Sequence, residues 1–218
     1  MGEHHAAVVA EVERQVASII GSGLLDGGPW SADRLWGKVE ALLPHLEEAI
    51  PEGPHVTRGQ APFVLVLPRT VLTPSSAVTA LRVNGQGASL AKGMDDLDRF
   101  APTVDLHVPS GVYAAVDVRR GDEYRGRTPE EGLASIAAER RSPLTLDEGL
   151  AFVSAWPDAL EKNHCFQTPG SRAGDRRVPG IWLRGSAPRV GFCWAGNHHT
   201  WLGVASCSLR VGADTTPA

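Results

Sequence analysis

The sequence predicts an α+β fold, in which helices and strands occur in blocks and do not alternate regularly. Two amphipathic segments fill the first fifty residues, apolar strands follow, and two capped helices precede a final group of strands. A doubly wound parallel sheet would need regular alternation of strands and helices. We therefore expect an N-terminal helical pair followed by a mixed or antiparallel sheet, with two capped helices and a C-terminal three-stranded meander.

The N-terminal region carries two amphipathic helical patterns. Apolar residues recur at spacings of three and four between Val8 and Ile20, and again between Leu35 and Leu46. The Pro-Glu-Gly-Pro sequence at 51–54 ends the second pattern. Each apolar stripe requires a partner surface, which is either the main body of the protein or a second subunit.

Three apolar segments in the middle of the chain predict strands. Residues 63–67 form a continuous apolar run that is typical of a buried strand. Residues 78–83 precede the turn sequence Asn-Gly at 84–85, and residues 112–118 are rich in β-branched and aromatic side chains. Between the last two segments, residues 94–100 predict a short helix or a turn.

Two helix starts lie seventeen residues apart, at Thr128 and Thr145. In each, the threonine caps the first turn and a glutamate three residues later returns a hydrogen bond, Glu131 in the first case and Glu148 in the second. Pro129 also suits the first helical position. We therefore expect a capping box at both starts.

The last quarter of the chain predicts three strands, at 178–183, 189–194 and 200–206. The polar sequence at 184–188 links the first two as a hairpin. A meander, in which each strand pairs with the one before it, is the simplest arrangement of the three.

The length of 218 residues suits one domain and is short for two large ones. We expect residues 1–55 to form a helical arm that belongs to the same domain or to a subunit interface. We expect residues 62–211 to form the α+β body and residues 212–218 to form a flexible tail.

The charge balance argues against a nucleic-acid partner, because 21 basic residues face 25 acidic ones and the net charge is −4. The three cysteines are an odd number, and the N-terminus lacks a basic segment followed by an apolar run, so a cytoplasmic location is expected. No apolar stretch approaches the roughly 20 residues of a membrane-spanning helix, so no membrane partner is expected.

The residue types that carry chemistry concentrate after residue 160. Aromatic walls with a few polar groups are what a small-molecule pocket requires. If the strands form a meander, the tryptophans could line a pocket at one end of the sheet. The alternative is that they are ordinary residues of the hydrophobic core. The region contains Trp182, Trp194, Trp201, His164, His198, His199 and all three cysteines.

A basic loop at 170–177 predicts an anion site. Arg172, Arg176 and Arg177 present guanidinium groups that suit a carboxylate, sulfate or phosphate, and Asp175 could orient one of them. The alternative is an internal salt-bridge cluster that pins the loop to acidic helices. The glycine spacing matches neither the phosphate-binding P-loop nor the dinucleotide fingerprint.

A metal cofactor is not expected, because no Cys-x-x-Cys pair and no His-x-x-x-His helix occurs. Covalent catalysis by Cys165 or Ser171 also lacks support, since no Gly-x-Ser-x-Gly elbow is present and a cysteine before phenylalanine is usually buried. Acid-base chemistry by His199 is possible near neutral pH, with Asn163 or Asn197 orienting the substrate.

The order of motifs after residue 60 resembles an actinobacterial family of unknown function, and the resemblance implies no particular activity. One departure is visible, because His198 stands where proline is expected, which leaves His199 as the equivalent histidine. The motifs are Ser-Pro-Leu-Thr-Leu-Asp-Glu-Gly at 142–149, Leu-Glu-Lys-Asn-His-Cys-Phe at 160–166, Gly-Ser-Arg-Ala-Gly-Asp-Arg-Arg-Val-Pro at 170–179, Gly-Phe-Cys-Trp-Ala-Gly-Asn at 191–197 and His-Thr-Trp-Leu-Gly at 199–203.

Two functional hypotheses follow. The first is a cofactor-independent enzyme of specialised metabolism that acts on a small anionic molecule, by elimination or intramolecular displacement with a sulfate or phosphate leaving group. The second is a non-catalytic small-molecule-binding or assembly module that docks a partner subunit through the N-terminal helices. The expected catalytic residues are His199 and His164, and the expected substrate-binding residues are Arg172, Asp175, Arg176, Arg177, Asn163, Ser171, Trp182, Trp194, Asn197 and Trp201.

Overall fold

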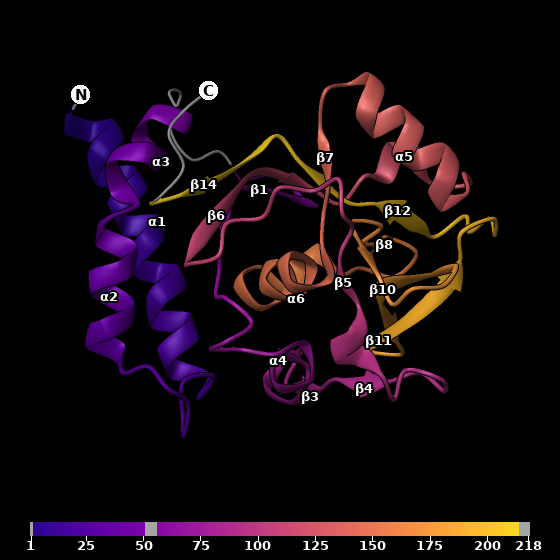
Figure 1. Ribbon diagram of the computed structural model, residues 1–218, viewed down its shortest axis with the longest axis horizontal. Helices are drawn as coiled ribbons and strands as arrows, with labels where there is room; N and C mark the ends of the chain where they lie inside the picture. Colours follow the sequence, from indigo (N-terminus) through magenta and orange to yellow (C-terminus); the bar gives the residue numbers. More distant parts are fainter. Residues whose placement is uncertain (1, 51–55, 214–218) are drawn as a thin grey trace.

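Two β-sheets enclose one central helix, and a layer of N-terminal helices covers the outer face of the first sheet (Figure 1). The computed structural model describes residues 2–50 and 56–213. The central helix is α6 (Leu146–Ala155), whose side chains pack against both sheets. This arrangement confirms the predicted α+β class.

The first sheet is antiparallel and has the order β1, β6, β13, β7, with β14 also paired to β6. Its strands are β1 (Gln60–Val66), β6 (Tyr113–Arg119), β7 (Ser142–Pro143), β13 (Ser206–Cys207) and β14 (Leu209–Gly212). The second sheet is mixed and has the order β12, β8, β10, β11, β4. Its strands are β4 (Ser89–Leu90), β8 (Cys165–Gln167), β10 (Arg177–Arg184), β11 (Ala187–Trp194) and β12 (Leu202–Val204).

Smaller elements connect these layers. Two short ladders pair β2 (Arg82–Val83) with β3 (Gln86–Gly87) and β5 (Ala101–Pro102) with β9 (Ser171–Arg172). The remaining helical elements of the described body are α4 (Pro74–Ala80), α5 (Pro129–Ala138), and the 3-10 turns η1 (Leu97–Arg99), η2 (Asp122–Tyr124) and η3 (Pro157–Ala159).

The N-terminal layer contains three helices, so the predicted pair is corrected to α1 (Gly2–Gly21), α2 (Ala32–Glu40) and α3 (Leu43–Ala49). Pro44 is the physical reason, because it has no N–H to continue the hydrogen bonding from α2 and is tolerated only in the first turn of α3. The apolar stripes of all three helices are buried against the first sheet. The expected helix end at 51–54 lies outside the described residues, as do residues 214–218 of the expected tail.

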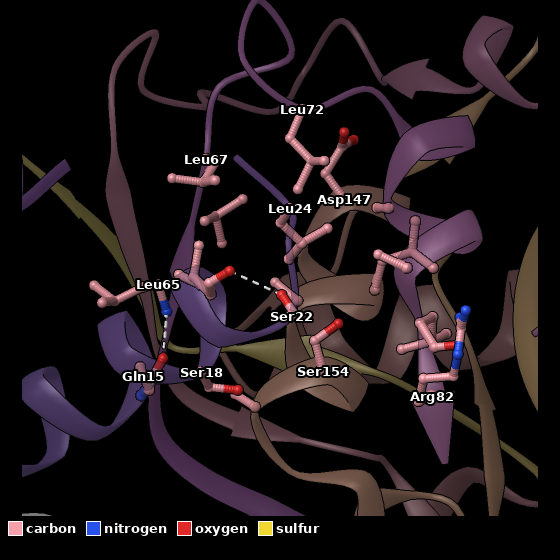
Figure 2. Close-up of a pocket in the computed structure, with 18 of the residues that line it drawn as sticks. Gln15, Ser18, Ser22, Leu24, Leu65, Leu67, Leu72, Arg82, Asp147 and Ser154 are labelled. Carbon is pink, nitrogen blue, oxygen red and sulfur yellow. Dashed lines mark hydrogen bonds between the residues drawn. The ribbon is translucent and has the colours of Figure 1, made fainter. Parts of the chain in front are cut away.

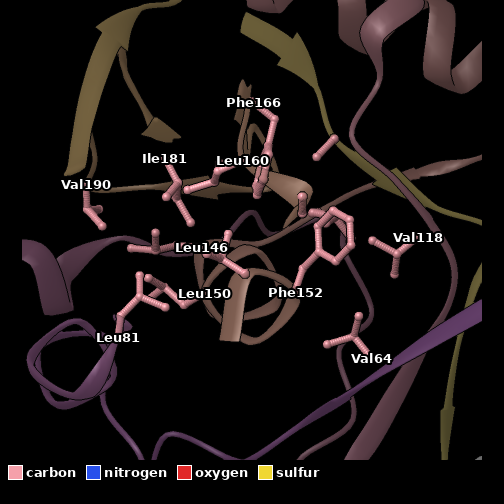
Figure 3. Close-up of a cluster of buried hydrophobic side chains, with 14 of the residues drawn as sticks. Val64, Leu81, Val118, Leu146, Leu150, Phe152, Leu160, Phe166, Ile181 and Val190 are labelled. Carbon is pink, nitrogen blue, oxygen red and sulfur yellow. The ribbon is translucent and has the colours of Figure 1, made fainter. Parts of the chain in front are cut away.

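Strand β1 is buried on both faces, as its continuous apolar run predicts. Phe63 and Leu65 belong to the cluster formed with the N-terminal helices. Val64 and Val66 belong to the cluster around α6, where Val64 lies near Phe152 (Figure 3). The strand therefore joins the two halves of the hydrophobic core.

The strand predicted at 78–83 is largely wrong, because Pro74–Ala80 forms α4 and only Arg82–Val83 of that segment forms a strand. The helix begins at Thr73, whose side chain accepts a hydrogen bond from the Ser76 N–H at 3.2 Å, and proline follows the cap. This local capping outweighs the β-branched residues that follow. The turn at Asn84-Gly85 is confirmed, with φ angles of 52° and 71°.

Both predicted capping boxes are confirmed. Thr128 caps α5 with Glu131, and Thr145 caps α6 with Glu148. In α6 the Thr145 N–H donates to Glu148 Oε2 at 2.7 Å, and the Glu148 N–H donates to Thr145 Oγ1 at 3.3 Å. These caps set the first turn of the helix around which the core is assembled.

The predicted three-stranded meander is wrong in its third strand. The hairpin of β10 and β11 is present in full register, but β12 pairs in parallel with β8 on the other side of β10. A close backbone approach holds β12 there, because a Cβ atom on Gly203 would lie only 2.5 Å from the Arg120 carbonyl oxygen. The chain then crosses to the first sheet as β13 and β14.

Candidate functional site

A cavity of about 580 Å³ lies between the C-terminal part of α1, strand β1, helix α4 and helix α6 (Figure 2). Its size falls within the range of about 300–1,000 Å³ typical of small-molecule sites. The apolar part of its wall includes Ile19, Leu24, Leu65, Leu67, Leu72, Leu81 and Leu150. Because its lining comes from four elements in three separate parts of the sequence, no single motif marks this cavity.

Two charged residues line the cavity, and only one of them is neutralised by an ion pair in the described structure. Asp147, in the first turn of α6, accepts hydrogen bonds from Arg69 at 2.6 and 2.9 Å. Burial raises the pKa of Asp147, and Arg69 opposes that rise. Arg82 donates to the Thr79 and Leu81 carbonyl oxygens and forms no ion pair among the described residues. The cavity therefore has one positive charge in its lining that no acidic side chain within residues 2–50 or 56–213 balances.

The basic loop forms a salt-bridge cluster around Arg177. Its guanidinium group contacts Asp96 at 2.6 Å and Asp175 at 2.8 Å, and it lies over the ring of Phe100. The hydrogen bonds that Arg177 donates to Asp96 raise the pKa of Arg177. Arg176 is exposed and lies 3.2 Å from Glu130. In these contacts Arg177 and Arg176 bind acidic side chains of the protein itself.

Arg172 differs from its two neighbours. Its side chain is partly buried and donates to the carbonyl oxygens of Pro169 at 2.6 Å and Ser171 at 2.9 Å. It forms no ion pair with any described residue, and burial lowers its pKa. Within the loop, this guanidinium is therefore the one that the described structure leaves without an acidic partner.

The serine and asparagines predicted to contact substrate have backbone and packing roles. Ser171 is fully buried, and its Oγ accepts a hydrogen bond from the Leu146 N–H at 2.9 Å, at the start of α6. Asn163 adopts a left-handed conformation with φ of 66°, and its carbonyl oxygen accepts from Arg125. Asn197 is exposed, and its N–H donates to the Trp194 carbonyl oxygen at 2.9 Å.

The two histidines predicted to be catalytic lie at the same end of the second sheet. His164 directly precedes β8 and Trp201 directly precedes β12, and these strands pair in parallel with Leu202 opposite Cys165. The His199 carbonyl oxygen accepts from Gly126, next to Arg125, which lies 3.4 Å from His164 Nε2. The turn at 125–126 thus contacts both histidine segments.

His164 is oriented by a carboxylate. Its Nδ1 lies 2.9 Å from Asp122 Oδ2, and the nearly fully buried Arg120 holds the same carboxylate with two hydrogen bonds at 2.6 and 2.8 Å. Burial favours protonation of Asp122, yet the hydrogen bonds from Arg120 and His164 lower its pKa. This pairing leaves Nε2 of His164 directed toward Arg125.

His199 and the tryptophans occupy an aromatic cluster. The rings of Trp182 and Trp201 meet edge to face, with 5.9 Å between their centroids. The His199 ring packs against Trp201 in the same way, with a centroid distance of 5.5 Å. Burial lowers the pKa of His199, and its Nε2 atom has no hydrogen-bond partner in the described structure. Trp194 is 51% exposed and lies at the opposite end of the β10–β11 hairpin, so the three tryptophans do not line one mouth.

The remaining candidates for chemistry are buried thiols. Burial raises the pKa of Cys165, whose Sγ contacts the Glu161 carbonyl oxygen. Among the described residues, no group of three or more histidine, cysteine, aspartate or glutamate side chains is placed to hold a metal ion.

No helix within residues 2–50 or 56–213 is long and apolar enough to cross a membrane.

Sequence reasoning missed the cavity and its charged residues. Asp147 lies inside the capping sequence of α6, where an acidic residue has an ordinary structural explanation, and Arg82 lies in a segment that was expected to be a strand. Gln15 lies on the buried stripe of α1. Nothing in the local sequence of these residues signals that they converge.

Two sheets around a central helix, with an apolar cavity beside that helix, define an α+β protein of a two-sheet architecture. The chain belongs to DUF5701, a family of unknown function, whose model matches residues 28–213. No curated protein and no solved structure matches the chain. The matched range begins after α1, so the residues that α1 contributes to the cavity lie outside it.

Proposed function

We propose that this protein binds a small amphipathic anion, a largely apolar molecule with one negatively charged group, in the cavity between α1, β1, α4 and α6. The observation that carries the proposal is the combination of leucine-rich walls with the charge of Arg82, which forms no ion pair with any residue of the described ranges. The proposal follows the second functional hypothesis, a non-catalytic small-molecule-binding protein. It places the anion-binding site in this cavity and not in the basic loop at 170–177.

The charge of the ligand follows from the charges around the cavity. Asp147 is neutralised by Arg69, so it offers little attraction to a cationic ligand. Arg82 keeps donor capacity beyond its two carbonyl contacts, because a guanidinium group has five N–H donors. An anion at the edge of the cavity would pair with Arg82 while its apolar body replaces water along the leucine walls.

The side chains that line the cavity favour binding over chemistry. Its polar groups include the hydroxyls of Ser18, Ser22 and Ser154, and neither histidine nor cysteine lines it in the described part of the chain. The Ser22 hydroxyl is already bonded to the Ile19 carbonyl oxygen at 2.8 Å. We therefore assign the cavity a role in holding a ligand.

A head-group series tests the proposed ligand class. Calorimetric titration with dodecanoate, dodecanol and dodecylamine should show the tightest binding for dodecanoate. Arg82→Gln should weaken dodecanoate binding about fivefold, which is the loss of an exposed ion pair of about 1 kcal/mol. The same substitution should leave dodecanol binding unchanged, and Arg184→Gln, which alters an exposed arginine outside the cavity, should change neither.

A second substitution tests the location. Ala151→Phe places an aromatic ring on the cavity-facing side of α6 and should abolish binding of both dodecanoate and dodecanol while the protein remains folded. Equal affinity of the wild-type protein for dodecanoate and dodecylamine would contradict the charge assignment. Unchanged binding by a folded Ala151→Phe protein would contradict the site.

Arg172 favours a second candidate function, a cofactor-independent enzyme that acts on a small anionic metabolite. In this proposal Arg172 stabilises the negative charge that develops on a sulfate or phosphate leaving group, and His199 or His164 moves the proton. The supporting observation is the partly buried guanidinium of Arg172, which lacks an acidic partner in the described structure.

Anion-dependent stabilisation tests this second candidate. Sulfate should raise the melting temperature of the wild-type protein by a few degrees, because an anion that binds only the folded state stabilises it. The increase should be lost in Arg172→Gln and kept in Arg176→Gln, whose arginine is exposed and already paired with Glu130. An equal increase in all three proteins would indicate a general salt effect and would count against an Arg172 site.

A further inference from the structure

Strand β1 is an edge strand whose free side is covered by a side chain. The order of the first sheet places β6 on one side of β1 and no described strand on the other. Gln15 of α1 occupies that side, since its Nε2 donates to the Phe63 carbonyl oxygen at 3.0 Å and its Oε1 accepts from the Leu65 N–H at 2.8 Å. A side-chain amide offers the same donor and acceptor as a peptide group, so Gln15 takes the place of a neighbouring strand.

The preceding residue of α1 reaches the opposite wall of the cavity. Arg14 donates to the carbonyl oxygen of Ala155 at 2.9 Å, at the end of α6, and its guanidinium lies 4.5 Å from the ring centroid of Trp156. Glu11, one turn earlier, accepts from both Arg14 and Gln15 at 2.9 and 2.8 Å. One turn of α1 is thus bonded to both β1 and α6.

The cavity lies between these two attachments and the end of the helix. Ser18 and Ser22, which follow the attachment point, line the cavity together with β1 and α6 (Figure 2). Ile19 also lines it. The part of α1 before the lid is anchored by apolar packing as well, because Val8, Val12 and Val16 are buried in the cluster with α2 and α3. The end of α1 is therefore a cover that the polar contacts of Arg14 and Gln15 hold closed together with the packing of Ile19 against this cluster.

The chain after α1 is suited to movement of this cover. Gly23 and Gly27 have φ angles of 73° and 69°, and the segment between α1 and α2 contains turns but no regular helix or strand. Such turns change backbone direction at little steric cost. Opening would require breaking the Gln15 and Arg14 contacts and the packing of Ile19, and would leave Val8 and Val12 packed against α2 and α3.

We propose that Arg14 and Gln15 form a latch that controls access of the ligand to the cavity, with the C-terminal end of α1 as the lid. This inference rests on the proposed function of the cavity and adds the way in which its ligand enters and leaves. The latch lies in α1, before the part of the chain that the family model matches. Gln15 is a positioning residue in this proposal, because it acts by holding the lid closed.

The Leu65 amide provides a direct probe of the latch. Its hydrogen is bonded to Gln15 Oε1, so its exchange with solvent reports opening of the lid. Saturating dodecanoate should slow exchange of this amide in the wild-type protein, because the bound ligand favours the closed form. Gln15→Met, which has a similar length and no hydrogen-bonding amide, should accelerate the exchange without ligand.

Ligand release gives the functional measurement. Release of isotope-labelled dodecanoate, followed by NMR exchange spectroscopy, should be roughly tenfold faster in Gln15→Met, since two buried hydrogen bonds are lost. Arg14→Met should accelerate release several-fold and provides a second test on a more exposed residue should Gln15→Met fail to fold. Glu13→Gln, an exposed neighbour on α1, should release the ligand at the wild-type rate.

The outcomes separate the latch from the cavity. Failure of the wild-type protein to bind dodecanoate overturns the proposed function and the latch with it. Normal binding with wild-type release rates in Gln15→Met and Arg14→Met, together with a Leu65 amide whose exchange does not respond to ligand, overturns the latch alone. Faster release in both variants with an unchanged Glu13→Gln control supports the latch.

Discussion

Replacing Glu148 with glutamine should lower the free energy of unfolding by about 3–5 kcal/mol, the cost of breaking a buried ion pair by removing one partner. Glu148 is fully buried in the first turn of α6. Its carboxylate accepts from Arg210 at 2.6 and 2.9 Å, from the Tyr113 hydroxyl at 3.0 Å and from the Thr145 N–H at 2.7 Å. In glutamine, an NH2 group would replace one carboxylate oxygen and would face an N–H or O–H group that also needs an acceptor.

The groups around Glu148 are adapted to its negative charge. Burial disfavours the charged form of Arg210, yet Glu148 raises the pKa of this guanidinium above its ordinary value. Burial and the nearby carboxylate together raise the pKa of Tyr113 well above its ordinary value. Loss of the carboxylate would therefore leave the Arg210 guanidinium buried without its acidic partner. The ion pair with Glu148 otherwise offsets the cost of burying that charge.

The second capping box of the chain provides a matched control for this prediction. Glu131 has the same position relative to Thr128 in α5, but its side chain is exposed to solvent. Glu131→Gln should therefore change stability far less than Glu148→Gln in urea denaturation measured by circular dichroism. Similar losses in the two variants would show that the effect comes from capping and not from the buried ion pair.

Gly121→Ala should lower the free energy of unfolding by about 4 kcal/mol or more, or prevent folding, because two effects act at one residue. Gly121 has a φ of 78°, which costs other residues about 1–2 kcal/mol. A Cβ atom there would also lie 2.1 Å from the Val204 carbonyl oxygen. The backbone of β12 would have to move away from η2 to make room for it.

Gly126→Ala separates the two effects. Gly126 has a similar φ of 81°, but a Cβ atom there would meet no other atom within 4 Å. This variant should lose only the conformational contribution of about 1–2 kcal/mol in thermal or urea unfolding. A loss in Gly121→Ala no larger than that in Gly126→Ala would contradict the proposed close packing of β12 against η2.

The same packing positions the histidine segments. Gly121 immediately precedes Asp122, which orients His164, and β12 immediately follows Trp201. If a folded form of Gly121→Ala is obtained, the imidazole resonances of His164 should shift in its NMR spectrum. Gly126→Ala, the control variant, should leave the contact between Asp122 and His164 unchanged.

Elements with a local physical cause could be predicted from the sequence. Thr128 and Thr145 identify helix starts because a cap depends on residues only three positions away. The run at Phe63–Leu67 identifies a doubly buried strand, and the turn at 184–188 identifies the β10–β11 hairpin. The strand predicted at 78–83 failed because the cap at Thr73, just outside that segment, determined the local structure.

The candidate site could be predicted only in part. The residue types singled out His164 and His199 as candidate catalytic residues, but their common position at the ends of β8 and β12 depends on a pairing that was not expected. Interpretation of the basic loop left open whether its arginines bind a ligand or acidic residues of the protein. The structure shows Arg177 paired with Asp96, which is 81 residues away in sequence.

By itself, the sequence determined the fold class, the two helix starts at Thr128 and Thr145, the hairpin and the buried strand β1, because these features depend on interactions between neighbours in the chain. Only the tertiary structure decided that Arg82 borders an apolar cavity, that Gln15 covers the edge of β1 and that Arg172 lacks the acidic partners of Arg177. The physical reason is that a free charge or a cavity depends on which distant segments meet, and the order of residues does not state those contacts.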